Sequence, residues 1–208
     1  MKLVFATGNR GKLREASEIL GPDWQLVTPA ELGITGELPE TAMTLKENSI
    51  QKAQALYSLC GLDCFADDTG LEVDALGGAP GAHAARFAAD IARRDGLPVP
   101  ADHDFSANID ALLRELSKCP GAPRTARFRS VVTLILGGRM HFFEGTLEGR
   151  IAMERSGEGG FGYDPVFIAD DYPDCSVAAL PEETKNAISH RGKALRAMAS
   201  WLQENGYE

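Results

Sequence analysis

The chain has 208 residues, of which 44% are hydrophobic and 25% are charged, as is ordinary for a globular protein. A chain of this length buries about 70% of its unfolded surface, so we expect a single domain over residues 1–208 with a sizeable core. The formal net charge of −9 argues against nucleic-acid binding, which needs a concentrated basic face, but permits a small anionic ligand held by a few local cations.

The cysteines, the histidines and the apolar runs argue against a zinc protein, a secreted protein and a membrane protein. No two of the four cysteines stand in a Cys-x-x-Cys motif, and the four histidines lack the His-x-x-x-His spacing of a zinc enzyme. The apolar run at residues 3–6 is too short for a signal peptide, and no apolar run reaches the ~18 residues of a membrane span. We therefore expect a cytoplasmic protein without membrane contact.

The first predicted elements are a buried strand at residues 2–7, a glycine-bearing turn at residues 8–12 and a helix. This arrangement directs backbone N–H groups and the positive end of the helix towards an anion, and Arg10 and Lys12 add charge. The turn is not a P-loop, because only two residues separate its glycines and a leucine follows Lys12. The alternative is an ordinary strand-to-helix turn with surface cations.

A second strand is predicted at residues 24–27, followed by a loop rich in glycine and proline and then by a helix. Thr44 and Glu47 have the spacing of a capping box at the start of that helix, so we assign Glu47 to capping. For Glu40 the sequence indicates no capping role. Its place just before the helix suits a side chain that reaches into a cleft.

The central stretch, residues 65–81, runs from an apolar start into two adjacent carboxylates. After a short strand we expect Asp67 and Asp68 to form a turn, since Asp and Gly are both depleted in strands. Adjacent carboxylates repel each other unless a cation lies beside them, and hard divalent cations take carboxylate oxygens as ligands. The alternative is a solvated acidic turn. Residues 76–81 carry three glycines and a proline and are expected to be irregular.

In the middle of the chain, the sequence predicts helices and strands that pack in the core and to which we assign no functional role. Residues 82–94 predict an alanine-rich helix, and residues 109–116 carry the apolar stripe of a second one. Residues 128–136 and 140–143 predict the two strands of a β-hairpin, because the two glycines between them suit a two-residue turn.

Residues 157–162 contain four glycines, and a loop of this kind is costly to order in isolation. Phe161 within it could stack on a flat ring, and Asp164 just after it could accept hydrogen bonds from ring N–H groups. The alternative is a glycine-rich hairpin whose Phe161 fills the core.

The last helix is expected to begin after Ser189, a natural N-cap, which places His190 and Arg191 in its first turn. The helix dipole disfavours cations there, and a pair that violates a local rule indicates a ligand contact. For His190 alone, a surface histidine at the cap is the alternative.

These parts are complementary. Cations and backbone N–H groups suit a polyphosphate, carboxylates suit Mg²⁺, and an aromatic loop suits a nucleotide base. Nucleoside triphosphate hydrolysis with Mg²⁺ is the reaction class that uses all of them.

Five segments resemble, in order and over nearly the whole chain, the inosine triphosphate pyrophosphatase family, also called non-canonical purine NTP or dITP/XTP pyrophosphatases. They are Thr-Gly-Asn-Arg-Gly-Lys at residues 7–12, Ala-Asp-Asp-Thr-Gly-Leu at 66–71, Ala-Leu-Gly-Gly-Ala-Pro-Gly at 75–81, Gly-Phe-Gly-Tyr-Asp-Pro at 160–165 and Lys-Asn-Ala-Ile-Ser-His-Arg at 185–191. Residues 88–103 lie outside these segments and are less regular than we expect for the family.

The resemblance implies an α/β fold, in which a long mixed β-sheet is flanked by helices and two lobes surround a central cleft, in a homodimer. It implies Mg²⁺-dependent hydrolysis of ITP, dITP and XTP to the nucleoside monophosphate and pyrophosphate, which removes these nucleotides from the pool. A non-catalytic nucleotide-binding module and a pyrophosphatase for other modified nucleotides are the alternatives.

The resemblance also implies roles for single residues. Asp68 would be the general base and, with Glu40, a metal ligand, while Asp67 would support it. A donor such as Arg191 would favour the 6-oxo group of hypoxanthine and xanthine over the 6-amino group of adenine. The residues expected to contact the substrate are Thr7, Gly8, Asn9, Arg10, Gly11, Lys12, Thr69, Phe161, Gly162, Tyr163, Asp164, Lys185, His190 and Arg191.

Overall fold

The computed structural model describes residues 1–207, and its elements belong to two compact units. Unit 1 comprises Met1–Thr69, Ser130–Thr146 and the chain from Ser189 onward, and unit 2 comprises Gly70–Arg129 and Leu147–Ile188. The strands are β1 (Lys2–Phe5), β2 (Gln25–Val27), β3 (Cys64–Val73), β4 (Pro80–Gly81), β5 (Thr125–Leu136), β6 (Arg139–Ile151) and β7 (Phe167–Ala169). The helices are α1 (Arg10–Leu20), α2 (Leu45–Cys60), α3 (Phe87–Asp95), α4 (Phe105–Ser117), α5 (Glu182–Ile188) and α6 (His190–Glu204).

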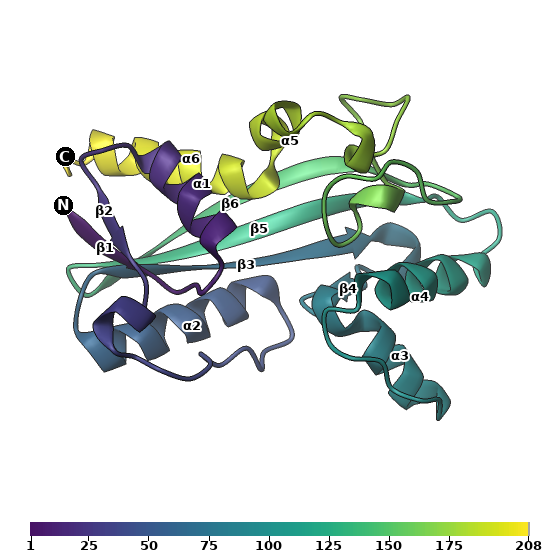
Figure 1. Cartoon of the computed structure of the whole chain (residues 1–208), viewed down its shortest axis with the longest axis horizontal. Helices are drawn as coiled ribbons and strands as arrows, with labels where there is room; N and C mark the ends of the chain where they lie inside the picture. The colour runs from purple at the N-terminus through teal and green to yellow at the C-terminus, as the bar shows by residue number, and fades with distance from the viewer. Residues whose placement is uncertain (208) are drawn as a thin grey trace. The chain divides into compact units, whose positions relative to one another are not determined.

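The strands within residues 1–207 form one sheet in the order β2-β1-β3-β5-β6-β7, with β4 paired to β3. The first strand, β1, pairs in parallel with both β2 and β3, whereas β3 with β4 and β6 with β7 are antiparallel pairs. Helices flank the strands (Figure 1). The predicted α/β class with a mixed sheet is therefore confirmed.

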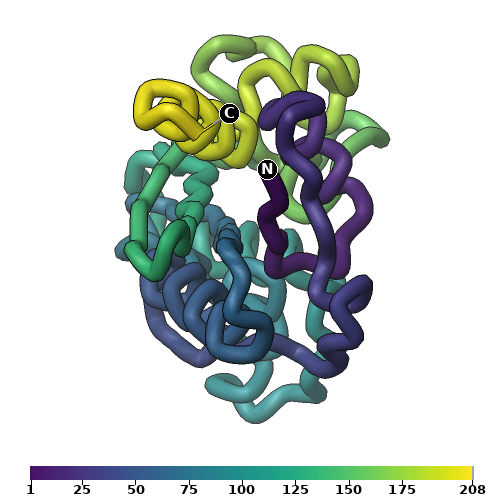
Figure 2. The backbone as a smooth tube through the Cα atoms, turned by 90° about the vertical axis from the view of Figure 1, so that its left-hand side faces the viewer, coloured from purple at the N-terminus to yellow at the C-terminus, as the bar shows by residue number. Residues whose placement is uncertain are grey.

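Unit 1 has helices on both faces of its strands. Figures 1 and 2 show α1 and α6 side by side on one face and α2 on the other. Side chains of a strand alternate between faces. Phe5 and Phe65 accordingly pack in the cluster that contains α1 and α6, whereas Val4, Cys64 and Ala66 pack in the cluster that contains α2.

Unit 2 has its own core, built around α3, α4 and the unit 2 portions of the long strands. Ile109, Leu112 and Leu116 of α4 are buried there, as their helical spacing predicts. The predicted helix at residues 82–94 begins later than expected, because a short 3-10 helix, Ala84–Arg86, precedes α3.

Two local predictions had opposite outcomes. The hairpin is confirmed: Gly137 and Gly138, between β5 and β6, have φ of 55° and 75°, the left-handed backbone that a tight two-residue turn requires. The prediction of a turn at Asp67 and Asp68 is wrong, because β3 continues through both residues to Val73. Strand preferences depend on what the side chains meet, and both carboxylates meet cations within unit 1.

Among the helices within residues 1–207, none combines the length and the apolarity that a membrane span requires.

Candidate functional site

The turn between β1 and α1 is held by its own side chains. Asn9 is the N-cap of α1, and its Oδ1 accepts hydrogen bonds from the N–H groups of Gly11 (2.8 Å) and Lys12 (3.1 Å). Thr7 Oγ1 accepts from the N–H of Asn9 at 3.1 Å. These bonds fix the start of α1, so that the Lys12 ammonium reaches Asp67 on β3.

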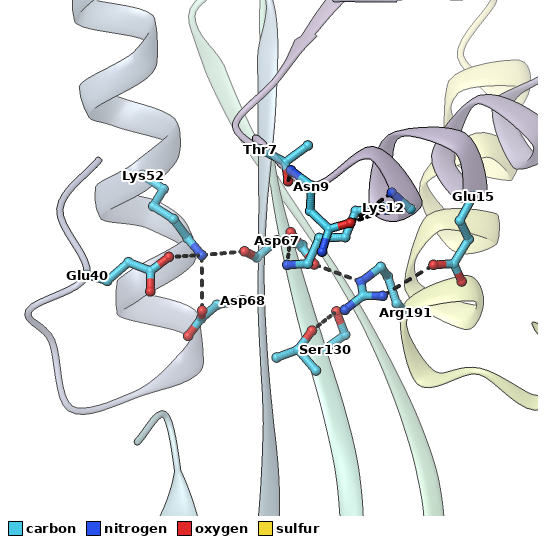
Figure 3. Close-up of polar contacts among 12 residues, drawn as sticks. Thr7, Asn9, Lys12, Glu15, Glu40, Lys52, Asp67, Asp68, Ser130 and Arg191 are labelled. Carbon is cyan, nitrogen blue, oxygen red and sulfur yellow. Dashed lines mark hydrogen bonds and ion pairs between the residues drawn. The ribbon is translucent and has the colours of Figure 1, made fainter. Parts of the chain in front are cut away.

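Asp67 is a buried carboxylate held between two cations. Its oxygens accept from Lys12 Nζ at 2.9 and 3.0 Å and from Arg191 Nε at 2.9 Å (Figure 3). Burial alone would raise the pKa of Asp67, but Lys12, Arg191 and Lys52 outweigh it and hold that pKa well below its usual range. Asp67 therefore stays ionised and is suited to anchoring cations, not to accepting a proton.

The start of α6 brings Arg191 to this carboxylate. Ser189 Oγ caps the helix by accepting from the N–H of Gly192 at 3.1 Å, as its sequence position predicts. Glu15 on α1 holds the same turn, since it accepts from Arg191 Nη1 at 3.3 Å (Figure 3). It also accepts from Ser189 Oγ at 3.2 Å. Arg191 is 8% exposed, and two carboxylates thus balance its buried charge.

His190 differs from Arg191 in its charge. Burial, together with Arg191, lowers the pKa of His190 to about 3, although Asp67 opposes the shift, so its imidazole is neutral near pH 7. The first turn of α6 also packs closely on β6 at Gly145, where a Cβ atom would overlap the carbonyl oxygen of His190. The sequence predicts His190 and Arg191 as two potential cations. In the structure Arg191 is a cation, whereas His190 is a half-buried neutral ring.

Asp68 points to the other face of β3, towards α2. Lys52 Nζ lies 3.0 Å from Asp68 Oδ1 and 2.7 Å from Glu40 Oε1 (Figure 3). Asn48 Nδ2 donates to Asp68 Oδ2 at 3.3 Å. Burial raises the pKa of Asp68; Lys52 and Asn48 lower it and Glu40 raises it, with a net rise. A carboxylate with a raised pKa is a better general base than an ordinary aspartate.

Lys52 remains a cation in this setting. Burial lowers the pKa of Lys52, but Asp68, Asp67 and Glu40 together more than reverse the effect and raise it. Its ammonium also donates to the backbone carbonyl oxygen of Asp67, so it joins the two adjacent acids across the strand.

Glu40 and Asp68 are the two carboxylates predicted to bind a divalent metal, and in the structure both contact Lys52 Nζ. Among residues 1–207, no group of three or more His, Cys, Asp or Glu side chains is arranged to hold a metal ion. Mg²⁺ commonly binds through one or two carboxylates together with waters and substrate phosphates, not through a cage made by protein alone. The pair therefore fits Mg²⁺ that enters with a phosphate ligand.

Thr69 follows Asp68 and lies at the end of the unit 1 portion of β3. Its Oγ1 donates to Ser130 Oγ on the neighbouring strand β5 at 3.1 Å. The remaining residues of the first predicted segment, Gly8 and Arg10, lie on either side of the Asn9 cap and are exposed.

The other predicted contacts lie in unit 2. Phe161 is 65% exposed, so the alternative in which it fills the core is wrong. Asp164 Oδ2 accepts from the N–H of Phe161 at 3.1 Å; burial raises the pKa of Asp164, while the Phe161 N–H and Lys185 oppose the rise. Tyr163 is buried and donates its hydroxyl to the Ala84 carbonyl oxygen at 2.8 Å, which is a structural contact.

Sequence reasoning missed several residues of unit 1 that contact Asp68 or other predicted site residues. For Lys52 and Asn48 the sequence holds a weak indication of burial, because both lie on the side of α2 that also presents Ala53 and Leu56 to the core. For Glu15 and Ser130 it holds none, since only the packing of α1 on α6 and of β3 on β5 reveals their partners.

Comparisons with known proteins agree over the length of the chain. The model of the Ham1 family matches residues 3–201. The chain is 48% identical over 201 residues to a dITP/XTP pyrophosphatase of Porphyromonas gingivalis, covering 97% of each chain, and 46% identical over 198 residues to one of Desulforamulus reducens, covering 94% of this chain and 92% of that protein. The solved structure of the Ham1 protein of Staphylococcus aureus is similar with a TM-score of 0.86 at 33% identity, over 99% of this chain and 100% of that one.

Proposed function

The chain belongs to the Ham1 family, and from that membership and the geometry of unit 1 we propose that it is a dITP/XTP pyrophosphatase. It hydrolyses ITP, dITP and XTP to the nucleoside monophosphate and pyrophosphate and so removes them from the nucleotide pool. The observation that carries this function is the position of Asp68, which faces Lys52 and Glu40 on one side of β3 while Asp67 holds Lys12 and Arg191 on the other.

Asp68 is the residue that we assign as general base. It is 8% exposed, its pKa is raised above the ordinary value of an aspartate, and Lys52 and Asn48 contact its two oxygens. A carboxylate held in this way accepts a proton from the water that attacks the α-phosphorus. Asp67 supports it indirectly, by holding Lys12, which is assigned to phosphate, and Arg191, which is assigned to the base.

The triphosphate contacts are assigned to the start of α1. Lys12 supplies a cation whose side chain is still 24% exposed, and Arg10 supplies a second one on the surface. Asn9 and Thr7 shape the turn, and the positive end of the helix dipole adds to the attraction. Thr7, Gly8 and Gly11 complete the proposed phosphate-binding segment.

Mg²⁺ is the proposed cofactor, with Glu40 and Asp68 as its protein ligands. Four carboxylates and three cationic side chains are joined by ion pairs in this cluster, namely Glu15, Glu40, Asp67 and Asp68 with Lys12, Lys52 and Arg191. A triphosphate adds several negative charges to a cluster without a cationic excess, so a divalent ion that binds with it offsets the repulsion. When bound, Mg²⁺ neutralises charge that develops on the phosphate oxygens.

The contacts to the base stay predictions. In unit 1 they are Thr69, His190 and Arg191. Because Arg191 bonds Asp67 through Nε and Glu15 through Nη1, we assign Nη2 to the 6-oxo group of the base. In unit 2 they are Phe161, Gly162, Tyr163, Asp164 and Lys185, of which Phe161 is the exposed ring suited to stacking.

A homodimeric, cytoplasmic enzyme that binds neither nucleic acid nor membranes completes the proposal. The net charge of −9 supports the absence of nucleic-acid binding. Light scattering coupled to gel filtration tests the dimer, since a mass of one chain at micromolar concentration contradicts it.

The function is tested by incubating the protein with ITP, XTP, GTP and ATP in Mg²⁺, with separate assays for pyrophosphate and orthophosphate. We expect pyrophosphate, released preferentially from ITP and XTP. Release of orthophosphate alone, or equal turnover of ATP, would refute the proposal. Binding without turnover would identify a nucleotide-binding module, and preference for a modified pyrimidine or methylated nucleotide would identify a different pyrophosphatase.

A further inference from the structure

Asn48 is a polar residue that is buried within a helix, where a polar side chain is usually unfavourable. It lies inside α2 and is 1% exposed. Asparagine is a weak helix former, because its side chain competes with the backbone for hydrogen bonds. A buried amide is tolerated where both its oxygen and its nitrogen find partners. The partners of Asn48 therefore indicate why the residue is there.

Both ends of the amide are used, and they bind two different parts of the proposed site. Asn48 Oδ1 accepts from the N–H of Ala42 at 2.9 Å, two residues after Glu40. Asn48 Nδ2 donates to Asp68 Oδ2 at 3.3 Å. Lys52 lies one turn further along the same face of α2, and its Nζ contacts Asp68 Oδ1 at 3.0 Å and Glu40 Oε1 at 2.7 Å.

The contacts close a ring that runs from Glu40 along the chain to Ala42, then through Asn48 and Asp68 to Lys52 and back to Glu40. Each oxygen of the Asp68 carboxylate has one donor from α2, so the carboxylate cannot rotate without breaking a contact. We propose that Asn48 is a positioning residue that fixes the Asp68 carboxylate and the Glu40 segment relative to each other. The inference rests on the proposed function, because it assigns Asn48 a part in that hydrolysis.

Gln51 offers a matched comparison on the same helix. Its Oε1 accepts from the N–H of Thr41 at 3.1 Å, so it fastens the Glu40 segment one residue earlier than Asn48 does. Its contacts are with Thr41, and none of its hydrogen bonds within residues 1–207 goes to Asp68. A change at Gln51 thus disturbs the segment without reorienting the carboxylate.

The decisive variant is Asn48→Asp. It keeps the oxygen that accepts from Ala42 but replaces the donor to Asp68 with a second carboxylate, which turns Asp68 away. We expect kcat with XTP to fall about 100-fold, the size of effect that a small misplacement of a reacting group produces. KM should stay within about threefold, because the phosphate contacts of α1 are untouched.

The charge-matched control is Gln51→Glu, which makes the same amide-to-acid change on the same helix. We expect its kcat to stay within about threefold of the wild type, as for most changes outside a buried network. Asn48→Ala removes both contacts without adding a charge, so it should also lower kcat more than KM. Hydrogen exchange of the Ala42 amide supplies a readout that needs no turnover: Asn48→Ala should lose protection there and Asn48→Asp should keep it.

Three results would overturn the inference. They are a kcat of Asn48→Asp within threefold of the wild type, an equal loss in Gln51→Glu, which would assign the effect to added charge, and unchanged Ala42 exchange in Asn48→Ala. All three are read against an active wild-type protein. A wild-type protein that releases no pyrophosphate from XTP refutes the proposed function itself, so the two failures are distinguishable.

Discussion

The two faces of β3 treat neighbouring aspartates in opposite ways. On the face covered by α1 and α6, Asp67 meets Lys12 and Arg191, and its pKa is held far below the usual range. On the face covered by α2, Asp68 meets Lys52, and burial raises its pKa. Two residues of one type, one position apart, acquire opposite properties because successive side chains of a strand point to opposite faces.

This difference separates two tasks of the proposed enzyme. The α1 and α6 face gathers cations around a carboxylate that stays ionised, which suits holding a triphosphate. The α2 face gathers carboxylates around one buried lysine, which suits activating water and holding Mg²⁺. Variants on the two faces should therefore divide between effects on binding and effects on turnover.

The largest effect is expected for Asp68→Asn. Loss of a general base lowers kcat by about 10²- to 10⁴-fold. The free energy of unfolding should fall by less than for Asp67→Asn, because Glu40 and the Asp67 carbonyl oxygen still contact the Lys52 ammonium in the variant. Pyrophosphate release from XTP and urea unfolding at pH 7 measure the two quantities. A fully active variant would remove Asp68 from the role of base.

Asp67→Asn should show the reverse pattern. Removal of one partner from a buried ion pair costs about 3–5 kcal/mol, so we expect a marked loss of stability at pH 7, together with a raised KM. Because the pKa of Asp67 is lowered in the folded state, its stabilisation is complete above the ordinary value of 3.8 and is lost as the pH falls below it. Urea unfolding at pH 7 and pH 3 should show the gap between variant and wild type narrowing at the lower pH. An equal gap at both would contradict the assignment.

The elements around this comparison were predictable where their signals are local. The apolar run of β1, the Thr44–Glu47 cap of α2, the Ser189 cap of α6 and the Gly137–Gly138 turn each rest on residues close together in the chain. Asp67 and Asp68 were wrongly given to a turn for the opposite reason. The cations that allow two acids inside a strand come from α1, α2 and α6, and strand propensity carries no information about them.

The site itself was predictable only in part. Lys12 and Arg191 stood out because they lie in segments that resemble the family, and Glu40 because it precedes a predicted helix without a capping role. In unit 1, Lys12 and Arg191 form ion pairs with Asp67. Glu40 forms one with Lys52. Lys52 did not stand out, because a lysine inside a helix is normally a solvated charge. Only the packing of α2 on β3 shows that it is buried between carboxylates.

His190, on the α1 and α6 side of β3, should make the stability of the protein depend on pH. Its pKa falls from an ordinary 6.5 to about 3 on folding, so between these values the unfolded chain binds a proton that the folded chain does not. Stability should therefore fall with decreasing pH in that window, by about 1.4 kcal/mol per pH unit. Urea unfolding of the wild type and His190→Leu from pH 7 to pH 4 isolates the contribution, since the carboxylates are common to both. Parallel curves would show that His190 is not neutral in the folded protein.

The smallest effects are expected from the two helix caps, one on each face. Thr44→Ala and Ser189→Ala each remove a hydroxyl that accepts a backbone N–H, a change that costs about 1 kcal/mol. Ser189 also donates to Glu15, which holds Arg191, so its loss should raise KM more than it lowers kcat. Thr44 caps the helix that carries Lys52, so its loss should lower kcat more than it raises KM. Steady-state kinetics with XTP separates these patterns, and the same pattern in both variants would mean that the two faces of β3 do not divide binding from turnover.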